Sequence, residues 1–181
     1  WKAYWWVHRT QGVFKMIIEV PVTEEMIIEA TKKAREMGQL KGSMMNGGRN
    51  LSGFLGELAV HSLLGGEIHN TYDYDILLNG RKIDVKAKST NYKPKPEYAA
   101  TIFKYSEKQG CDYFVFTNVK KDLSKVWVCG TYERDGFVKD GVLKRKGEKF
   151  YAGTREIEYR RDNYEMKIGD LKPIDVLKEA A

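Results

Sequence analysis

The dipeptide Asn79-Gly80 separates two runs of strand-forming residues, and it constrains the fold more than any other feature of the chain. A type I′ turn needs two residues that accept a positive φ, and Asn-Gly is the pair that favours it most strongly. The sequence therefore predicts a β-hairpin that joins residues 74–78 to residues 81–88. In the register of a two-residue turn, Asp75 faces Asp84 across the ladder.

Two carboxylates in that arrangement need a positive partner. Opposed side chains in an antiparallel pair have Cβ atoms about 5 Å apart. At an effective dielectric near 20, two negative charges at that distance repel by roughly 3 kcal/mol. Carboxylate oxygens that converge from two strands are ligands that Mg²⁺ accepts, with water and phosphate oxygens completing its shell. The pair Asp75 and Asp84 is therefore a candidate metal site.

The second strand of the hairpin should present charge on one face and apolar residues on the other. Because side chains alternate along a strand, Asp84 and Lys86 share a face with Lys88, while the residues between them fill the core. An ammonium at Lys86 can stabilise an attacking hydroxide and the charge that grows on a phosphate. The alternative is a surface ladder of salt bridges in which Asp73 faces Lys86, and the spacing leaves both interpretations open.

Composition favours one folded domain with a polyanionic partner. The 181 residues are 42% hydrophobic and 31% charged, with a net charge of +6 and a pI near 9.1. That length suits a single domain over 1–181, with a core at about 51–130 and with 13–38 and 131–181 as appendages. The two cysteines lack zinc or disulfide spacing, and no apolar run is long enough to span a bilayer, so we expect a cytoplasmic protein without a membrane partner.

Periodicity and turn signals predict the remaining elements. Apolar residues at helical spacing predict helices over 23–38, 51–64, 102–109 and 173–179. Runs rich in β-branched and aromatic residues predict strands over 13–20, 67–69, 113–118, 125–130 and 164–168. The aromatic cluster at 1–6 suits either base stacking with nucleic acid or a hydrophobic cover or subunit contact.

Three segments in order carry a resemblance to a known family. They are an acid on a helix in Gly56-Glu57-Leu58-Ala59, an acid on a strand in Tyr74-Asp75-Ile76, and Ile83-Asp84-Val85-Lys86 after a tight turn. The set resembles the PD-(D/E)xK nuclease superfamily, in particular its small phage and bacterial endonucleases, over about 51–130. Tyr74 stands where the motif has its proline, so Asp73 or Asp75 could be the first acid, and the hairpin register selects Asp75.

The resemblance implies a restriction-endonuclease-like α/β core, in which helices flank a mixed central β-sheet. It implies Asp75 and Asp84 as ligands of Mg²⁺, for which Mn²⁺ substitutes, and the Val85 carbonyl as a further ligand. Lys86 would be the catalytic lysine, and Glu57 would help to hold the metal or the water. The expected function is metal-dependent hydrolysis of DNA in the cytosol of a bacterium or a phage-infected host.

Other readings of the function remain at this stage. The chain could be a noncatalytic DNA-binding or assembly module that keeps the nuclease fold, or it could act on RNA. A homodimer is possible, and the sequence specifies no base-reading element. Basic residues near the proposed site could contact phosphates or form a solvated surface; they are Arg49, Lys88, Lys93 and Lys95.

Overall fold

The computed structural model describes residues 17–38, 50–69, 71–152 and 154–179. Its helical segments are α1 (Glu24–Gly38), α2 (Asn50–Leu64), α3 (Arg134–Asp140) and the 3₁₀ turns η1 (Lys104–Lys108), η2 (Ile168–Asp170) and η3 (Ile174–Leu177). Its strands are β1 (Ile18–Pro21), β2 (Glu67–Ile68), β3 (Ile76–Leu78), β4 (Arg81–Thr90), β5 (Ala99–Phe103), β6 (Tyr113–Lys120), β7 (Lys125–Glu133), β8 (Val142–Lys144), β9 (Lys149–Ala152), β10 (Arg155–Glu158) and β11 (Asn163–Lys167). None of the helices in these ranges is both long and apolar enough to cross a bilayer.

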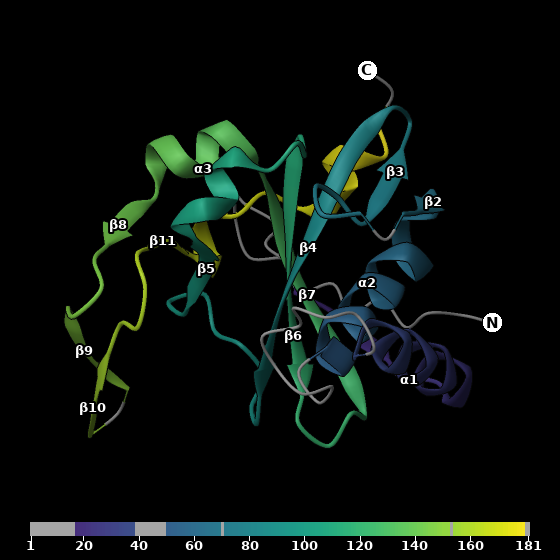
Figure 1. The fold of residues 1–181 in the computed structure, drawn as a ribbon, viewed down its shortest axis with the longest axis horizontal. Helices are drawn as coiled ribbons and strands as arrows, with labels where there is room; N and C mark the ends of the chain where they lie inside the picture. The colour runs from purple at the N-terminus through teal and green to yellow at the C-terminus, as the bar shows by residue number, and fades with distance from the viewer. Residues whose placement is uncertain (1–16, 39–49, 70, 153, 180–181) are drawn as a thin grey trace, which may run out of the picture.

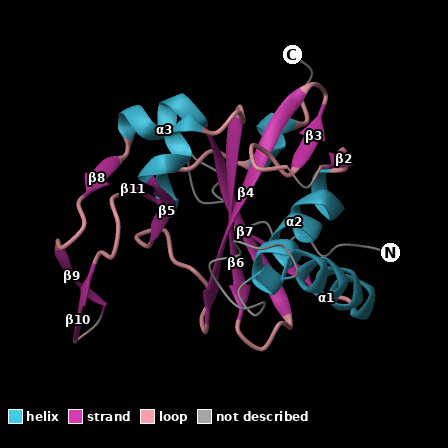
Figure 2. Cartoon of the chain, viewed as in Figure 1, coloured by secondary structure: helices cyan, strands magenta, loops and turns pink. Residues whose placement is uncertain are grey.

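A mixed sheet organises the molecule (Figures 1 and 2). Its strand order is β1-β7-β6-β4-β3-β2, and β4 pairs in parallel with β6 while the other neighbours are antiparallel. Helices α1 and α2 lie on one side of this sheet, and α3 lies on the other side with the three-stranded sheet β5-β11-β8. The prediction of an α/β fold with a mixed central sheet is thus confirmed at this level.

Both faces of the central sheet are buried, because each packs against its own hydrophobic core. The α2 face carries Ile83, Val85 and residues of β6 and β7, and η3 adds Ile174 and Leu177 to the same cluster. The opposite face builds a second cluster with Phe114, Phe116 and Phe137 of α3, and the rings of Phe116 and Phe137 stack at 5.0 Å. A polar residue in the middle of β4, such as Asp84, is therefore placed between packed layers.

The hairpin prediction is confirmed. Asn79 and Gly80 have φ values of 51° and 77°, as a type I′ turn requires, and Leu78 lies opposite Arg81. The ladder also pairs Ile76 with Ile83. The predicted alternation of β4 follows, with Ile83 and Val85 buried in the core and Lys86 on the other face.

The helix predicted over 102–109 is wrong. Residues Ala99–Phe103 form β5, which pairs antiparallel with β11, and only one 3₁₀ turn, η1, follows it. The burial of β5 alternates, with Ala100 and Ile102 in the second core. Residues 99–103 form a strand because they pair with β11 and bury every second side chain. The local residue spacing cannot reveal a partner that is distant in sequence.

The region after Tyr132 is more ordered than the sequence indicated. Helix α3 and strands β8 to β10 were not predicted, and the predicted helix at 173–179 is the 3₁₀ turn η3. The predictions of α1, α2, β2, β6, β7 and β11 are confirmed with shifted ends. Of the strand predicted over 13–20, β1 accounts for the last residues, and residues 13–16 and the aromatic cluster 1–6 lie outside the described ranges.

Candidate active site

Asp75 lies just before β3, at the point where β3 and β4 begin to pair. The paired residues end at Ile76 and Ile83, so the ladder does not extend to the predicted pair of Asp75 with Asp84. Instead, the Asp75 N–H donates to the Ile83 carbonyl (2.9 Å), and Asp75 Oδ2 accepts from the Val85 N–H (2.7 Å). The carboxylate thus takes the place of a backbone acceptor, and this is the physical reason for the departure from the regular register.

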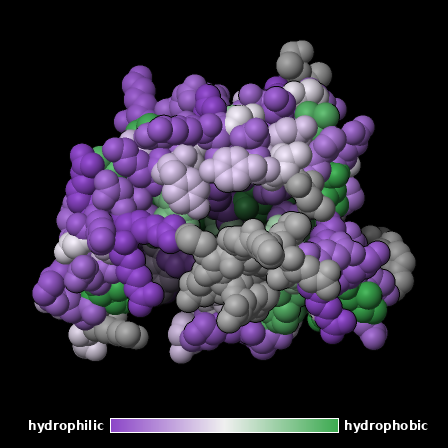
Figure 3. Space-filling model, viewed as in Figure 1, coloured by the Kyte–Doolittle hydropathy of each residue, from purple (hydrophilic) through white to green (hydrophobic). Residues whose placement is uncertain are grey.

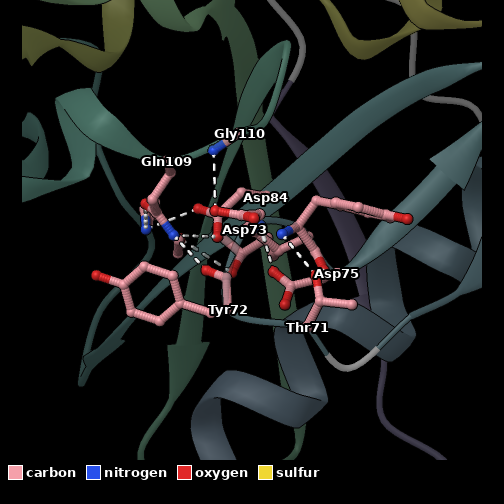
Figure 4. A network of polar contacts seen from close by, with 11 residues as sticks. Thr71, Tyr72, Asp73, Asp75, Asp84, Gln109 and Gly110 are labelled. Carbon is pink, nitrogen blue, oxygen red and sulfur yellow. Dashed lines mark hydrogen bonds and ion pairs between the residues drawn. The ribbon is translucent and has the colours of Figure 1, made fainter.

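Asp84 and Lys86 form an ion pair beside this carboxylate on β4. The distance from Lys86 Nζ to Asp84 Oδ2 is 2.7 Å, with ion-pair rather than hydrogen-bond geometry. Asp84 is only 6% exposed, and Lys86 Nζ also lies 5.4 Å from the centre of the Phe114 ring. The alternative in which Asp73 pairs with Lys86 is not observed: Lys86 pairs with Asp84, and Asp73 accepts from the Gly110 N–H (Figure 4).

Glu57 reaches the same region from α2. Its side chain is buried, and Oε2 has no hydrogen-bond partner among the described residues. An unpaired buried carboxylate oxygen is costly unless a proton or a cation satisfies it. Burial is the largest influence on the pKa of Glu57 and raises it; the charge of Lys33 on α1 opposes this effect, and the charge of Asp84 adds to it. Helix α2 therefore brings a third acid to the site.

The electrostatics show that the three acids share one environment. Burial, followed by the charges of Glu57 and Asp84, raises the pKa of Asp75 to about 8 against the opposing Val85 N–H bond and the charge of Lys86. Burial likewise raises the pKa of Glu57 to about 7. The negative charges of α2, the start of β3 and β4 thus act on one another, and the charge of Lys86 partly offsets their effect on Asp75.

The donor set fits a hard divalent cation. Asp75, Asp84 and Glu57 offer carboxylate oxygens, and the orphaned Glu57 Oε2 is a buried acceptor that a cation would satisfy. Because the N–H and C=O of one strand residue point to the same side, the Val85 carbonyl faces the edge where Asp75 lies. In the described ranges no three such side chains are already arranged as a metal cage. Two of the carboxylate oxygens that a cation would bind already have partners: Asp84 Oδ2 pairs with Lys86, and Asp75 Oδ2 accepts from the Val85 N–H.

The residues predicted to contact phosphates lie in different places. Lys88 is exposed two residues beyond Lys86, and with it lines a small hollow against β5 and β6. Lys93 and Lys95 are exposed in the loop after β4, and the charge of Lys93 acts on Glu19 of β1. Arg49 lies outside the described residues. Of the four, Lys88 alone is shown next to the proposed catalytic lysine.

Sequence reasoning missed Gln109, which follows η1. Its amide bridges Asp84 and Lys86, and the residue is only 6% exposed. Figure 4 shows Gln109 beside Asp84. Arg134, at the start of α3, donates to the Gln109 carbonyl. A single glutamine before a glycine gives no periodic or motif signal, so only the tertiary contacts of its side chain with β4 identify it.

The sequence was compared with models of known protein families and with curated proteins. No family model matches the chain. No curated protein matches it either. The resemblance to PD-(D/E)xK nucleases therefore stays a prediction that rests on the three motif segments, and the arrangement of the site must carry any functional argument.

Proposed function

We propose that the protein is a divalent-cation-dependent nuclease that hydrolyses phosphodiester bonds of DNA, with Mg²⁺ as the cofactor and Mn²⁺ as a substitute. The observation that carries the proposal is that Asp84 pairs with Lys86 while the charges of Glu57 and Asp84 act on the Asp75 carboxyl group, so that acids from α2, from the start of β3 and from β4 lie in one region. Burying three acids beside one lysine is costly for stability, and such arrangements cluster at functional sites. The order and identity of these residues agree with the nuclease motif.

Each side chain has a role that its surroundings suit. Asp75, Asp84, Glu57 and the Val85 carbonyl would hold the cation. The cation, when bound, supplies charge stabilisation at the phosphate and makes water a better nucleophile. The Lys86 ammonium stabilises the negative charge that develops on the phosphate oxygens, and Glu57 orients the attacking water and accepts its proton. Attack forms one P–O bond and breaks the ester P–O bond.

The surroundings of the site are compatible with a polyanionic substrate. The net charge is +6, and Lys88 extends the basic character of β4 beyond Lys86. The face shown in Figure 3 is mostly hydrophilic, and it is hollowed over the part of the molecule where Figure 1 places β4. A phosphate backbone is recognised mainly through such lysine contacts, which position the strand without reading its bases.

The test is cleavage by the wild type and by Lys86→Ala. Both proteins are incubated with supercoiled, linear, single-stranded and four-way DNA, in Mg²⁺ or in chelator. We expect the wild type to cut at least one of these only with the cation, and Lys86→Ala to lose at least about a hundredfold in rate, since it removes a charge that stabilises the transition state. DNA binding by the variant, measured in chelator, should stay close to wild type.

The matched control is Lys149→Ala, which removes an exposed lysine of β9 that pairs with Glu156. It should cut like the wild type, because it removes the same charge at a place remote from β4 (Figure 1). Full activity of Lys86→Ala, or no cleavage of any DNA by the wild type, would contradict the proposed nuclease.

A second candidate is a noncatalytic DNA-binding module. It is favoured by the engagement of Asp84 with Lys86 and of Asp75 with the Val85 N–H, which leaves no preassembled cage among the described residues. Such a module needs no cation at these acids. Titration with Mg²⁺ in a DNA-binding assay separates the two: DNA binding by the module should not depend on Asp84→Asn, and no DNA should be cut.

A further inference from the structure

The Gln109 side chain makes three hydrogen bonds beside the acid cluster. Its Oε1 accepts from Lys86 Nζ (2.8 Å), and its Nε2 donates to Asp84 Oδ1 (3.2 Å) and to the Tyr72 carbonyl (3.0 Å). Both ends of the amide are therefore satisfied although the residue is nearly inaccessible to solvent. A buried amide with this many partners is costly to disturb.

The chemistry of the partners fixes the direction of this amide. An ammonium can only donate, so the oxygen must face Lys86, whereas the Asp84 carboxylate and the Tyr72 carbonyl can only accept, so the NH₂ must face them. The backbone is fixed as well, because Arg134 donates to the Gln109 carbonyl and the Gln109 N–H donates to the Ser106 carbonyl (3.1 Å). Hydrogen bonds thus hold both the side chain and the backbone of Gln109, so its Oε1 is a fixed acceptor for Lys86.

Lys86 therefore has two acceptors that differ in charge. Asp84 Oδ2 lies 2.7 Å from its ammonium and Gln109 Oε1 lies 2.8 Å away. A divalent cation bound by Asp84 would repel the ammonium from Oδ2, because two positive charges cannot share that oxygen closely. The neutral Gln109 oxygen is the acceptor that would still hold Lys86 in this position, since the lysine chain is long and flexible.

We infer that Gln109 is a positioning residue, which keeps the Lys86 ammonium in the site when a divalent cation takes its place on Asp84. The catalytic consequence of this inference rests on the proposed nuclease function. Its binding consequence does not, because the exchange between Lys86 and a cation at Asp84 occurs whether or not DNA is cut.

The test is a double-mutant cycle with Gln109→Met and Lys86→Met, in which methionine matches the length of glutamine, is one atom shorter than lysine, and removes the polar contacts of both. Mn²⁺ affinity is measured by calorimetry for the wild type, both single variants and the double variant. Lys86→Met should bind Mn²⁺ more tightly, since it removes a competing cation. Gln109→Met should change Mn²⁺ affinity by one factor when Lys86 is present and by another in Lys86→Met. The two factors should differ by between about threefold and a hundredfold, as expected for coupled neighbours.

Kinetics on a cleaved DNA provide the second measurement. Gln109→Met should lower kcat with little change in KM in the Lys86 background, and it should have no further effect once Lys86 is replaced. Ser106→Ala is the control, because Ser106 is fully buried in η1 but its side chain has no described contact with Lys86. It should leave Mn²⁺ affinity unchanged, and thermal unfolding of every variant checks that the fold is retained.

The outcomes separate the two proposals. If Gln109→Met changes Mn²⁺ affinity by the same factor in both backgrounds, Gln109 acts only as packing and the inference is overturned. A wild type that shows the coupling in Mn²⁺ binding but cuts no DNA supports the inference and overturns the nuclease. A wild type that binds no Mn²⁺ overturns both.

Discussion

Asp75 shows how one residue can serve both the ladder and the site. Its Oδ2 accepts the Val85 N–H, so the carboxyl group is held between β3 and β4 where a backbone acceptor would otherwise lie. Burial and the neighbouring acids raise its pKa, so the folded protein binds a proton here that the unfolded chain releases. The local geometry therefore predicts a specific dependence of stability on pH.

In chelator, the free energy of unfolding of the wild type should fall as pH rises from about 4 to about 8. The folded state binds more protons than the unfolded state in this window, because the pKa values of Asp75 and Glu57 are raised above their ordinary values. Asp75→Asn keeps an oxygen for the Val85 N–H but removes the titration. The free energy of unfolding of Asp75→Asn, minus that of the wild type, should therefore be at least about 1 kcal/mol higher at pH 8 than at pH 5. Denaturant unfolding at both pH values measures this difference.

The comparison variant is Asp73→Asn, which also removes one acid but from an exposed position. Its change in stability between the two pH values should follow the wild type. A pH dependence that Asp75→Asn leaves untouched would mean that the half-buried carboxyl group at residue 75 does not carry the effect.

At the scale of elements, the site depends on how closely α2 approaches the sheet. Gly56 allows this approach, because a Cβ added there would lie 2.6 Å from Thr117 Oγ1 and 3.1 Å from the Ala87 Cβ. Gly53, one turn earlier in the same helix, has nothing within 4 Å of such a Cβ. The two glycines form a matched pair with the same helical context and opposite surroundings.

We expect Gly56→Ala to cost about 1–3 kcal/mol, because α2 or β6 must shift to accept the methyl group. Gly53→Ala should instead stabilise by roughly 0.5–1 kcal/mol, since alanine favours the helix and nothing is displaced. Denaturant unfolding of both variants measures the difference. If the two substitutions have equal effects, α2 does not pack against β4 and β6 as described, and the placement of Glu57 would be in doubt.

Elements with strong local signals were predictable, and those defined by distant partners were not. Asn79-Gly80 and the helical spacing in α2 specify their own conformations, so the hairpin and this helix follow from the sequence. By contrast, β5 is a strand because it pairs with β11 more than fifty residues away. The same limit applies to the site: motif residues of β4 were identified, whereas Gln109 depends on tertiary packing.

At the scale of the whole molecule, the C-terminal segment completes the core that supports the hairpin. Ile174 and Leu177 are buried in the same cluster as Ile83 and Val85 of β4. The Arg81 guanidinium at the start of β4 donates to the carbonyls of Val176 (3.1 Å) and Leu177 (3.4 Å). A segment almost a hundred residues from the hairpin in sequence thus fixes the strand that carries Asp84 and Lys86.

Leu177→Ala should therefore destabilise the whole fold by about 2–5 kcal/mol, as expected when a fully buried leucine is truncated. For a domain of this size the unfolding midpoint should fall by about 2–4 °C for each kcal/mol. Val142→Ala, at a position 58% exposed on β8, should shift it little. Equal midpoints for the two variants would show that η3 does not complete the core beneath β4. A large difference would mean that the acids and Lys86 depend on a closing segment far outside the motif, so that a fragment ending after β7 would lack the support that positions them.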